Sequence, residues 1–200
     1  MKKTALYQAI DGGRKAVPET PIYCSTSDAR LGFGYYFWDS IIGAAHWWGK
    51  QRYGENNYII CQSFYDAHSD KYFDLVGNLL HKEQLKSCAD KLRARGRQGF
   101  ALAEVLEGLR EVCPEFDDLY WAIRAEAVNK HYLDRKQDFP LRKEEPTSCE
   151  DGDISFARGT KLVLSCGLRV QLCVTNLAFL LEGEYTAICY PEYRDASYMA

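Results

Sequence analysis

Hydrophobic and polar positions alternate through the first third of the chain, which predicts a series of short β-strands. The segment TALYQAI alternates in this way and ends in DGG, as a strand followed by a turn does. NNYIICQSFYD is a strongly apolar run of β-prone residues. The extended segments expected here are residues 4–10, 20–27, 34–39, 56–66 and 71–75.

The spacing changes near residue 76, where apolar residues begin to recur every three or four positions. This predicts helices over 76–96 and 100–113, with Gly96 as a stop, and a third helix through 116–136. A helix over 41–51 with Asp39 or Ser40 as its N-cap is also expected. From residue 138 the pattern is β-like again, in DFPLRKEEP, TKLVLSC, LRVQLCVTN and EYTAICYPE. We therefore expect one α+β domain over 1–200, a split mixed or antiparallel sheet with a helical insertion at 76–137.

Composition narrows the class of protein further. With 46% hydrophobic and 26% charged residues, the 200-residue chain has the balance of a soluble globular domain. A net charge of −3 argues against a whole-molecule grip on nucleic acid, although KLRARGRQ forms a local basic run. The start, MKKTALYQAIDGG, lacks the apolar middle of a signal peptide, and no apolar run is long enough for a membrane span. We expect a cytoplasmic protein without a membrane partner.

The eight cysteines form no C-x-x-C pair, and the four histidines are scattered along the chain. Several cysteines lie inside apolar strand segments such as YIICQSF and VQLCVTN. This favours small buried thiols in a reducing compartment. We expect no metal site.

The segment GFGYYFWDSIIGAAHWWGK, residues 32–50, concentrates glycines and aromatic residues. Tyr36 at a strand end and Trp47 on the following helix can bring two aromatic faces around a slot that suits a planar ring. Gly32 and Gly34 would let the backbone pass close to a ligand. The alternative is that the same aromatic residues are simply packed into the core.

The residues of this segment resemble the catalytic core of the ADP-ribosyltransferase superfamily, in its poly(ADP-ribose) polymerase and diphtheria-toxin branch. GFGYYFWD is similar to that family's Gly-Lys-Gly-Ile-Tyr-Phe-Ala-Asp, and LYQA stands where the family has Leu-Trp-His-Gly. YIICQSFYDAHSDKYFDL and VQLCVTNLAFLLEGEYTAI resemble later strands in the same order. The resemblance covers 4–75 and 150–192, and it suggests a bacterial or phage-related member.

The resemblance implies a site in which Gln-Tyr-Gln replaces the family's His-Tyr-Glu. It implies that Gln8, Tyr36 and Gln171 are catalytic, and that NAD is the co-substrate. A serine that contacts nicotinamide is replaced by Ala44, and a tyrosine that stacks on it by Trp47. The residues expected to bind NAD are Gln8, Ala9, Gly34, Tyr36, Ala44 and Trp47.

Two alternatives concern the missing carboxylate. Gln171 can accept a hydrogen bond but brings no negative charge, so the chain is either a slow transferase or one whose carboxylate comes from Glu182, Glu184 or a base of the acceptor. The superfamily's other branch uses Arg, Ser-Thr-Ser and Glu-x-Glu, and the chain contains Arg14, STS at 25–27 and EGE at 182–184. We do not favour that branch, because Arg14 follows a turn and the assignment leaves GFGYYFWD unexplained.

The resemblance implies a mono-ADP-ribosyltransferase that cleaves NAD and modifies a protein or a nucleic acid. A compact transferase of this kind suits a toxin of a toxin–antitoxin or antiphage system, with an antitoxin as a partner. The two glutamines also allow an inactive transferase fold that binds NAD, ADP-ribose or a partner protein. A structural protein without a ligand is the third hypothesis.

Overall fold

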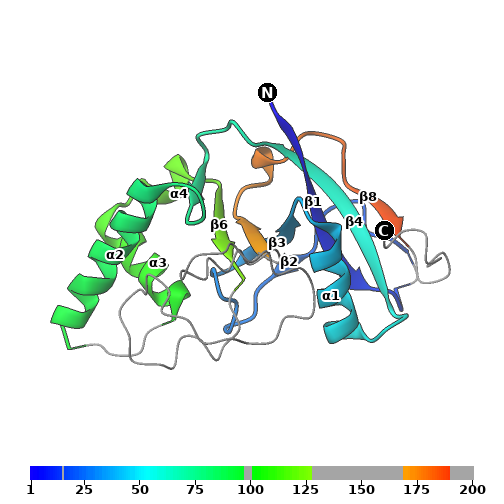
Figure 1. Ribbon diagram of the computed structural model, residues 1–200, viewed down its shortest axis with the longest axis horizontal. Coiled ribbons are helices and arrows are strands. Elements are labelled where there is room, and N and C mark those ends of the chain that lie inside the picture. The colour runs from blue at the N-terminus through cyan, green and yellow to red at the C-terminus, as the bar shows by residue number, and fades with distance from the viewer. Residues whose placement is uncertain (15, 97–100, 128–168, 190–200) are drawn as a thin grey trace, which may run out of the picture.

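The computed structural model describes residues 1–14, 16–96, 101–127 and 169–189 (Figure 1). These residues form a mixed α+β fold around an open sheet in the strand order β5-β6-β7-β3-β1-β4-β8, with β2 paired to β3. All pairs are antiparallel except β5 with β6. The α+β class and mixed sheet expected from the sequence are confirmed. The strands are β1 Lys3–Asp11, β2 Tyr23–Cys24, β3 Gly34–Asp39, β4 Tyr58–Asp66, β5 Tyr72–Asp74, β6 Ala122–Glu126, β7 Val170–Val174 and β8 Thr186–Cys189.

The helices lie in two groups. Helix α1 (Ile42–Tyr53) packs on β1 and β4, whereas α2 (Leu79–Ala94) and α3 (Leu102–Val112) pack together at the β5–β6 end of the sheet. Figure 1 shows α1 and the α2–α3 pair well apart, with β6 and β3 between them. A short helix α4 (Phe116–Leu119) and a 3-10 turn η2 (Leu177–Phe179) complete the described elements.

The predicted stop of α2 at Gly96 agrees with the structure, whereas the predicted N-cap of α1 does not. The side chain of Asn78 caps α2 by accepting hydrogen bonds from the backbone N–H groups of Leu80 and His81, and Gly96 (φ +85°) follows its end. The prediction that Asp39 or Ser40 caps α1 is wrong, because its N-cap is Ile41 and no side chain caps it. Asp39 instead forms an ion pair with Arg124.

The third predicted helix is also wrong, because Ala122–Glu126 is strand β6. It pairs with β5 on one side and with β7 on the other, and Ala122, Ile123 and Ala125 are buried. Helices α2 and α3 lie within the predicted insertion at 76–137, but residues 128–137 lie outside the described residues. So do the predicted strands DFPLRKEEP and TKLVLSC.

Strand alternation gives the sheet two faces with different covers. The helix face carries Tyr7, Tyr36, Trp38, Gln171 and Cys173, which the strand register places on one side. Part of this face packs against α1, and part against α2 and α3. The loop face carries Leu6, Gln8, Phe37, Asp39, Arg124 and Leu172. Phe179 and Tyr185 pack against that second face.

Candidate functional site

The part of the helix face between α1 and the α2–α3 pair brings together residues that are distant in sequence. Trp38 on β3 lies directly across from Gln171 on β7, and Gln171 in turn lies across from Ala125 on β6. Gln171 is half-buried, and its amide makes no hydrogen bond within the described part of the chain. A free amide beside an aromatic ring is able to orient a polar, planar ligand.

Trp38 is the centre of an aromatic cluster. Its ring centroid lies 6.1 Å from that of Trp47 at an interplanar angle of 89°, and 6.3 Å from that of Trp48. The guanidinium carbon of Arg169 lies 3.9 Å from the centroid of Trp47. Trp38 is buried, Trp47 is half-buried and Trp48 is 39% exposed, so the cluster extends from the core to the surface.

Tyr36 lies on the same face but packs with a different group of residues. Its hydroxyl accepts the Leu31 N–H at 2.7 Å and donates to the Gly32 carbonyl at 2.8 Å. Burial raises the pKa of Tyr36 well above its ordinary value. Tyr36 packs with the core cluster of α2 and α3, whereas Trp47 packs with Trp38. Tyr36 and Trp47 therefore belong to different clusters, whereas the sequence predicts that they form a slot together. The aromatic neighbour of Trp47 is Trp38, a residue that the sequence analysis does not single out.

Gln8 lies on the loop face, opposite to the side chains of Tyr36 and Gln171. It is 6% exposed, and its amide has several partners. The amide nitrogen donates to the carbonyls of Ile22 (3.0 Å) and Tyr36 (3.2 Å), and the amide oxygen accepts from the Ile22 N–H (2.9 Å) and the Tyr185 hydroxyl (2.8 Å). These hydrogen bonds hold Ile22, the residue before β2, against β1 and β3 in the centre of the sheet.

The small residues predicted to bind NAD pack closely against neighbouring elements. Ala9 and Ala44 are buried in the tryptophan cluster. A Cβ on Gly34 would lie 2.6 Å from the Cys173 sulfur and 2.8 Å from the Val174 carbonyl oxygen. The glycine is therefore required for the approach of β3 to β7, so a neighbouring strand makes the close approach that the sequence suggests for a ligand.

The carboxylates considered as substitutes lie away from Gln171. Glu182 is exposed, and Glu184 forms an ion pair with Lys3 at 2.6 Å. In the sheet order, β3, β1 and β4 separate β7 from β8, which follows Glu184. Arg14 and the STS segment at 25–27 are exposed.

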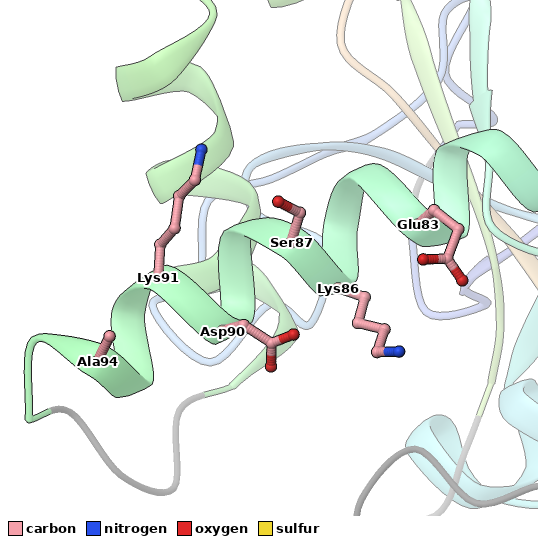
Figure 2. Close-up of a pocket in the computed structure, with 6 residues that line it drawn as sticks. All are labelled: Glu83, Lys86, Ser87, Asp90, Lys91 and Ala94. Carbon is pink, nitrogen blue, oxygen red and sulfur yellow. The ribbon is translucent and has the colours of Figure 1, made fainter.

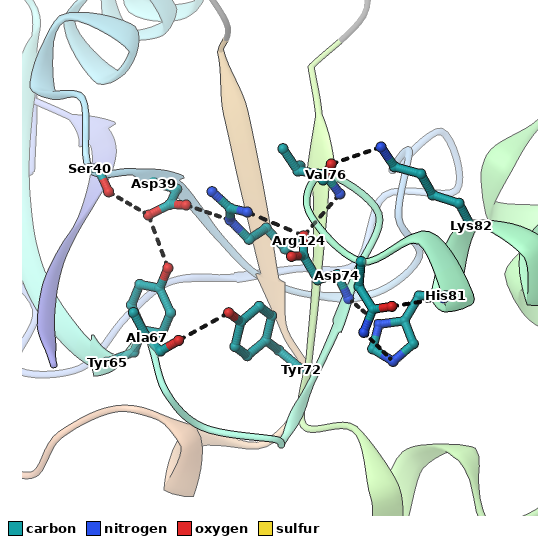
Figure 3. Close-up of polar contacts among 11 residues, drawn as sticks. Asp39, Ser40, Tyr65, Ala67, Tyr72, Asp74, Val76, His81, Lys82 and Arg124 are labelled. Carbon is teal, nitrogen blue, oxygen red and sulfur yellow. Dashed lines mark hydrogen bonds and ion pairs between the residues drawn. The ribbon is translucent and has the colours of Figure 1, made fainter. Parts of the chain in front are cut away.

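An ion-pair cluster on the loop face was not expected from the sequence (Figure 3). Arg124 contacts Asp39 at 2.6 Å and Asp74 at 3.2 Å, and Asp39 also accepts hydrogen bonds from Ser40 and Tyr65. Burial opposes the charge on Arg124, but its bond to Asp39 and the charge of Asp74 outweigh burial and raise its pKa. The cluster connects β3, β5 and β6, and its partners are too far apart in sequence for spacing to suggest it.

Helix α2 carries a shallow hollow on its exposed side, shown in Figure 2. All of its lining residues come from this one helix: Glu83, Lys86, Ser87, Asp90, Lys91 and Ala94. The basic run near its end is partly neutralised, because Arg93 pairs with Asp90 at 2.8 Å. A mixed-charge hollow on a single helix lacks the convergent groups of a ligand pocket.

Comparisons with protein-family models, curated proteins and solved structures found no significant match. Among the described residues, no three His, Cys, Asp or Glu side chains gather as metal ligands would. No helix in the described ranges has the length and apolar character to cross a membrane. The geometry of the helix face and the residues on it are therefore the basis for a functional proposal.

Proposed function

We propose that the protein is a mono-ADP-ribosyltransferase that cleaves NAD at the bond between nicotinamide and ribose and transfers ADP-ribose to a protein or nucleic-acid acceptor. The observation that carries the proposal is the position of Gln171 beside Trp38, with Trp47 packed against Trp38. A planar ring can lie against the half-buried ring of Trp47, because Trp38 itself is buried, while the free amide of Gln171 contacts the attached sugar. The resemblance of residues 32–39 to the superfamily's signature identifies that ring as nicotinamide.

The chemistry assigns a different task to each of the three signature residues. The amide oxygen of Gln171 accepts a hydrogen bond from the ribose 2′-hydroxyl and orients the sugar. Nicotinamide leaves with the electrons of the glycosidic bond, and the acceptor nucleophile attacks the ribose C1′ and releases its proton to a base or to water. Tyr36 and Gln8 act as positioning residues, Tyr36 through the 31–32 backbone and Gln8 through the segment at Ile22.

The neutral side chain of Gln171 limits the rate. By analogy with other preorganised groups, a negative charge beside the developing cation lowers the activation barrier by about 2–4 kcal/mol. The neutral amide of Gln171 does not supply that charge. We therefore propose a slow transferase that does not extend polymers. Action as a cytoplasmic toxin paired with an antitoxin, or in antiphage defence, follows from the resemblance and belongs to the same proposal.

A binding module is the second candidate, and a specific observation favours it. The two residues that flank Gln171 in the sheet, Trp38 and Ala125, carry no charge. Such a site can hold NAD or ADP-ribose without cleaving it.

Substitution of Gln171 separates the two candidates. For the transferase, Gln171→Ala lowers the rate of nicotinamide release from NAD by about tenfold or more, and Gln171→Glu raises it by a similar factor. The measurement is chromatographic quantification of free nicotinamide. The matched control is Gln62→Ala, because Gln62 is also half-buried and its amide makes a single 3.3 Å hydrogen bond to Tyr7.

Equal rates in wild type, Gln171→Ala and Gln171→Glu would contradict the role of Gln171. Saturable binding of NAD by the wild type, without release of nicotinamide by any of the variants, would support the binding module.

A further inference from the structure

Helix α1 carries a large aromatic ring at the surface of the protein. Trp48 is 39% exposed, and its ring centroid lies 6.3 Å from that of Trp38 and 6.3 Å from that of Trp47. The ring is tilted by 50° and 44° against these two neighbours, so neither covers its face by stacking. A ring that is held by packing and open to solvent can stack on a planar group of a partner.

Two arginines without carboxylate partners lie near this ring. Arg52 follows Trp48 by four residues, which places both on one face of α1, and Arg52 is exposed. Arg169 is half-buried, and its guanidinium lies over the ring of Trp47, which contacts Trp48. Neither arginine forms an ion pair among the described residues, whereas Arg110 pairs with two carboxylates.

The surface around Trp48 is basic, although the chain as a whole has a net charge of −3. Helix α1 contains no Asp or Glu, and its last turn carries Lys50 and Arg52. Glu55, just beyond the end of the helix, pairs with Lys50 at 2.8 Å, so its charge is compensated. The surface therefore combines an open aromatic ring with positive charge that no carboxylate on α1 neutralises.

We propose that Trp48, Arg52 and Arg169, which we call the Trp48 surface, bind a single-stranded nucleic acid. Every base has a planar face that can stack on Trp48, and the phosphates next to that base can accept hydrogen bonds from the two guanidiniums. A duplex keeps its bases stacked on one another, so an unpaired strand fits this surface better. An acidic peptide matches the arginines but carries no planar group beside each charge.

The role of this strand as the acceptor rests on the proposed function. Trp48 contacts Trp47, against which the nicotinamide ring of NAD is proposed to lie. A base that stacks on Trp48 is therefore brought close to the reacting ribose, which makes nucleic acid the acceptor class. Binding of the strand itself requires no NAD, so the two proposals can be tested separately.

The test measures binding of a fluorescein-labelled single-stranded oligonucleotide of mixed sequence to the full chain, by fluorescence anisotropy without NAD. Trp48→Ala is expected to weaken binding at least about fivefold, because it removes the stacking of one base. Trp48→Phe keeps a smaller aromatic face and is expected to bind with intermediate affinity. Phe33→Ala is the matched control, since Phe33 is 56% exposed and lies in the loop that packs with the α2–α3 cluster.

The two arginines are tested by the salt dependence of binding. Arg52→Gln and Arg169→Gln are each expected to reduce the slope of log affinity against log salt concentration by about 0.7–1, because each removes one phosphate contact. Arg95→Gln is the control, since Arg95 is exposed in the basic run at the end of α2. Arg52 is exposed, so its variant tests the surface even if Trp48→Ala is unstable. Equal effects of Arg95→Gln and Arg52→Gln would mean that total charge governs binding and would overturn the inference.

The results also separate this inference from the proposed function. Oligonucleotide binding that depends on Trp48 and Arg52, without release of nicotinamide from NAD, would support the Trp48 surface and contradict the transferase. No measurable binding of the oligonucleotide, or equal affinity in wild type and all variants, would overturn the surface even if NAD is cleaved. Entry of the ADP-ribose label from NAD into protein alone would identify a protein acceptor and would also overturn the inference.

Discussion

Gln8 illustrates how a residue at a signature position can also be a structural one. Its amide uses both donors and its acceptor within the fold, on the face opposite to Gln171. Because the side chain is nearly inaccessible, any contribution to NAD chemistry must pass through the backbone that it holds. The resemblance indicates the position of Gln8 in the motif, and the hydrogen bonds of its amide show that the side chain holds the neighbouring backbone.

We therefore expect Gln8→Ala to lower the free energy of unfolding by about 2–4 kcal/mol, because it leaves several buried polar groups without partners. Urea unfolding followed by circular dichroism measures the change. Gln62→Ala, which removes one long hydrogen bond, is expected to cost less than about 1 kcal/mol. Equal stability of Gln8→Ala and wild type would show that the Gln8 network contributes nothing to folding.

At the scale of elements, β6 connects the two halves of the sheet through Arg124. Its ion pair with Asp39 reaches β3, and its ion pair with Asp74 reaches the adjacent β5. The carboxylate of Asp39 is 2% exposed, so removing Arg124 leaves a nearly inaccessible charge without its cation.

We expect Arg124→Met to lower the free energy of unfolding by about 3 kcal/mol, and Asp39→Asn in the same chain to recover part of that loss. The double-mutant cycle is measured by urea unfolding. Arg93→Met is the control, because the Arg93–Asp90 pair is exposed and is expected to contribute less than about 1 kcal/mol. If Arg93→Met costs as much as Arg124→Met, burial of the cluster is not the source of its stability.

The hydrophobic pattern predicts the strands and helices that local sequence determines, but it does not predict β6, which tertiary contacts determine. The apolar alternation of β1 and β4, and the three- and four-residue spacing of α2 and α3, follow from how each element buries one side. Residues 122–126 contain two alanines and two charges, which favour a helix. Pairing with β5 and β7 and the ion pairs of Arg124 override that preference.

The candidate site was partly predictable for the same reason. Tyr36 and Trp47 stand out within one segment, whereas the contact of Trp38 with Gln171 depends on the pairing of β3 with β7. Strand order across so long a sequence separation cannot be read from spacing.

At the scale of the whole molecule, the two helix groups cover different parts of one sheet face, since α2 and α3 pack with Tyr36 and Cys173 and α1 packs with Trp38. The same packing buries phenol groups on both faces. Burial raises the pKa of Tyr36, Tyr65 and Tyr185 well above the ordinary value of about 10.

These shifts predict a loss of stability in alkaline solution. Below about pH 10 the three phenols keep their protons in both states, so their contribution is fully present. Above that pH only the unfolded chain releases them, and the free energy of unfolding falls by about 1.4 kcal/mol per pH unit for each phenol. Urea unfolding at rising pH, with tyrosinate absorbance as the second readout, tests this. Titration of all tyrosines near pH 10 without loss of stability would contradict it.

The most direct test of the central claim is incubation of the purified protein with NAD labelled on its adenine side, alone and with cell extract. Release of nicotinamide and entry of the label into protein or nucleic acid is the predicted result, and it also identifies the acceptor class. NAD that stays intact in both incubations would contradict the transferase. In that case, the helix face would be a binding surface at most.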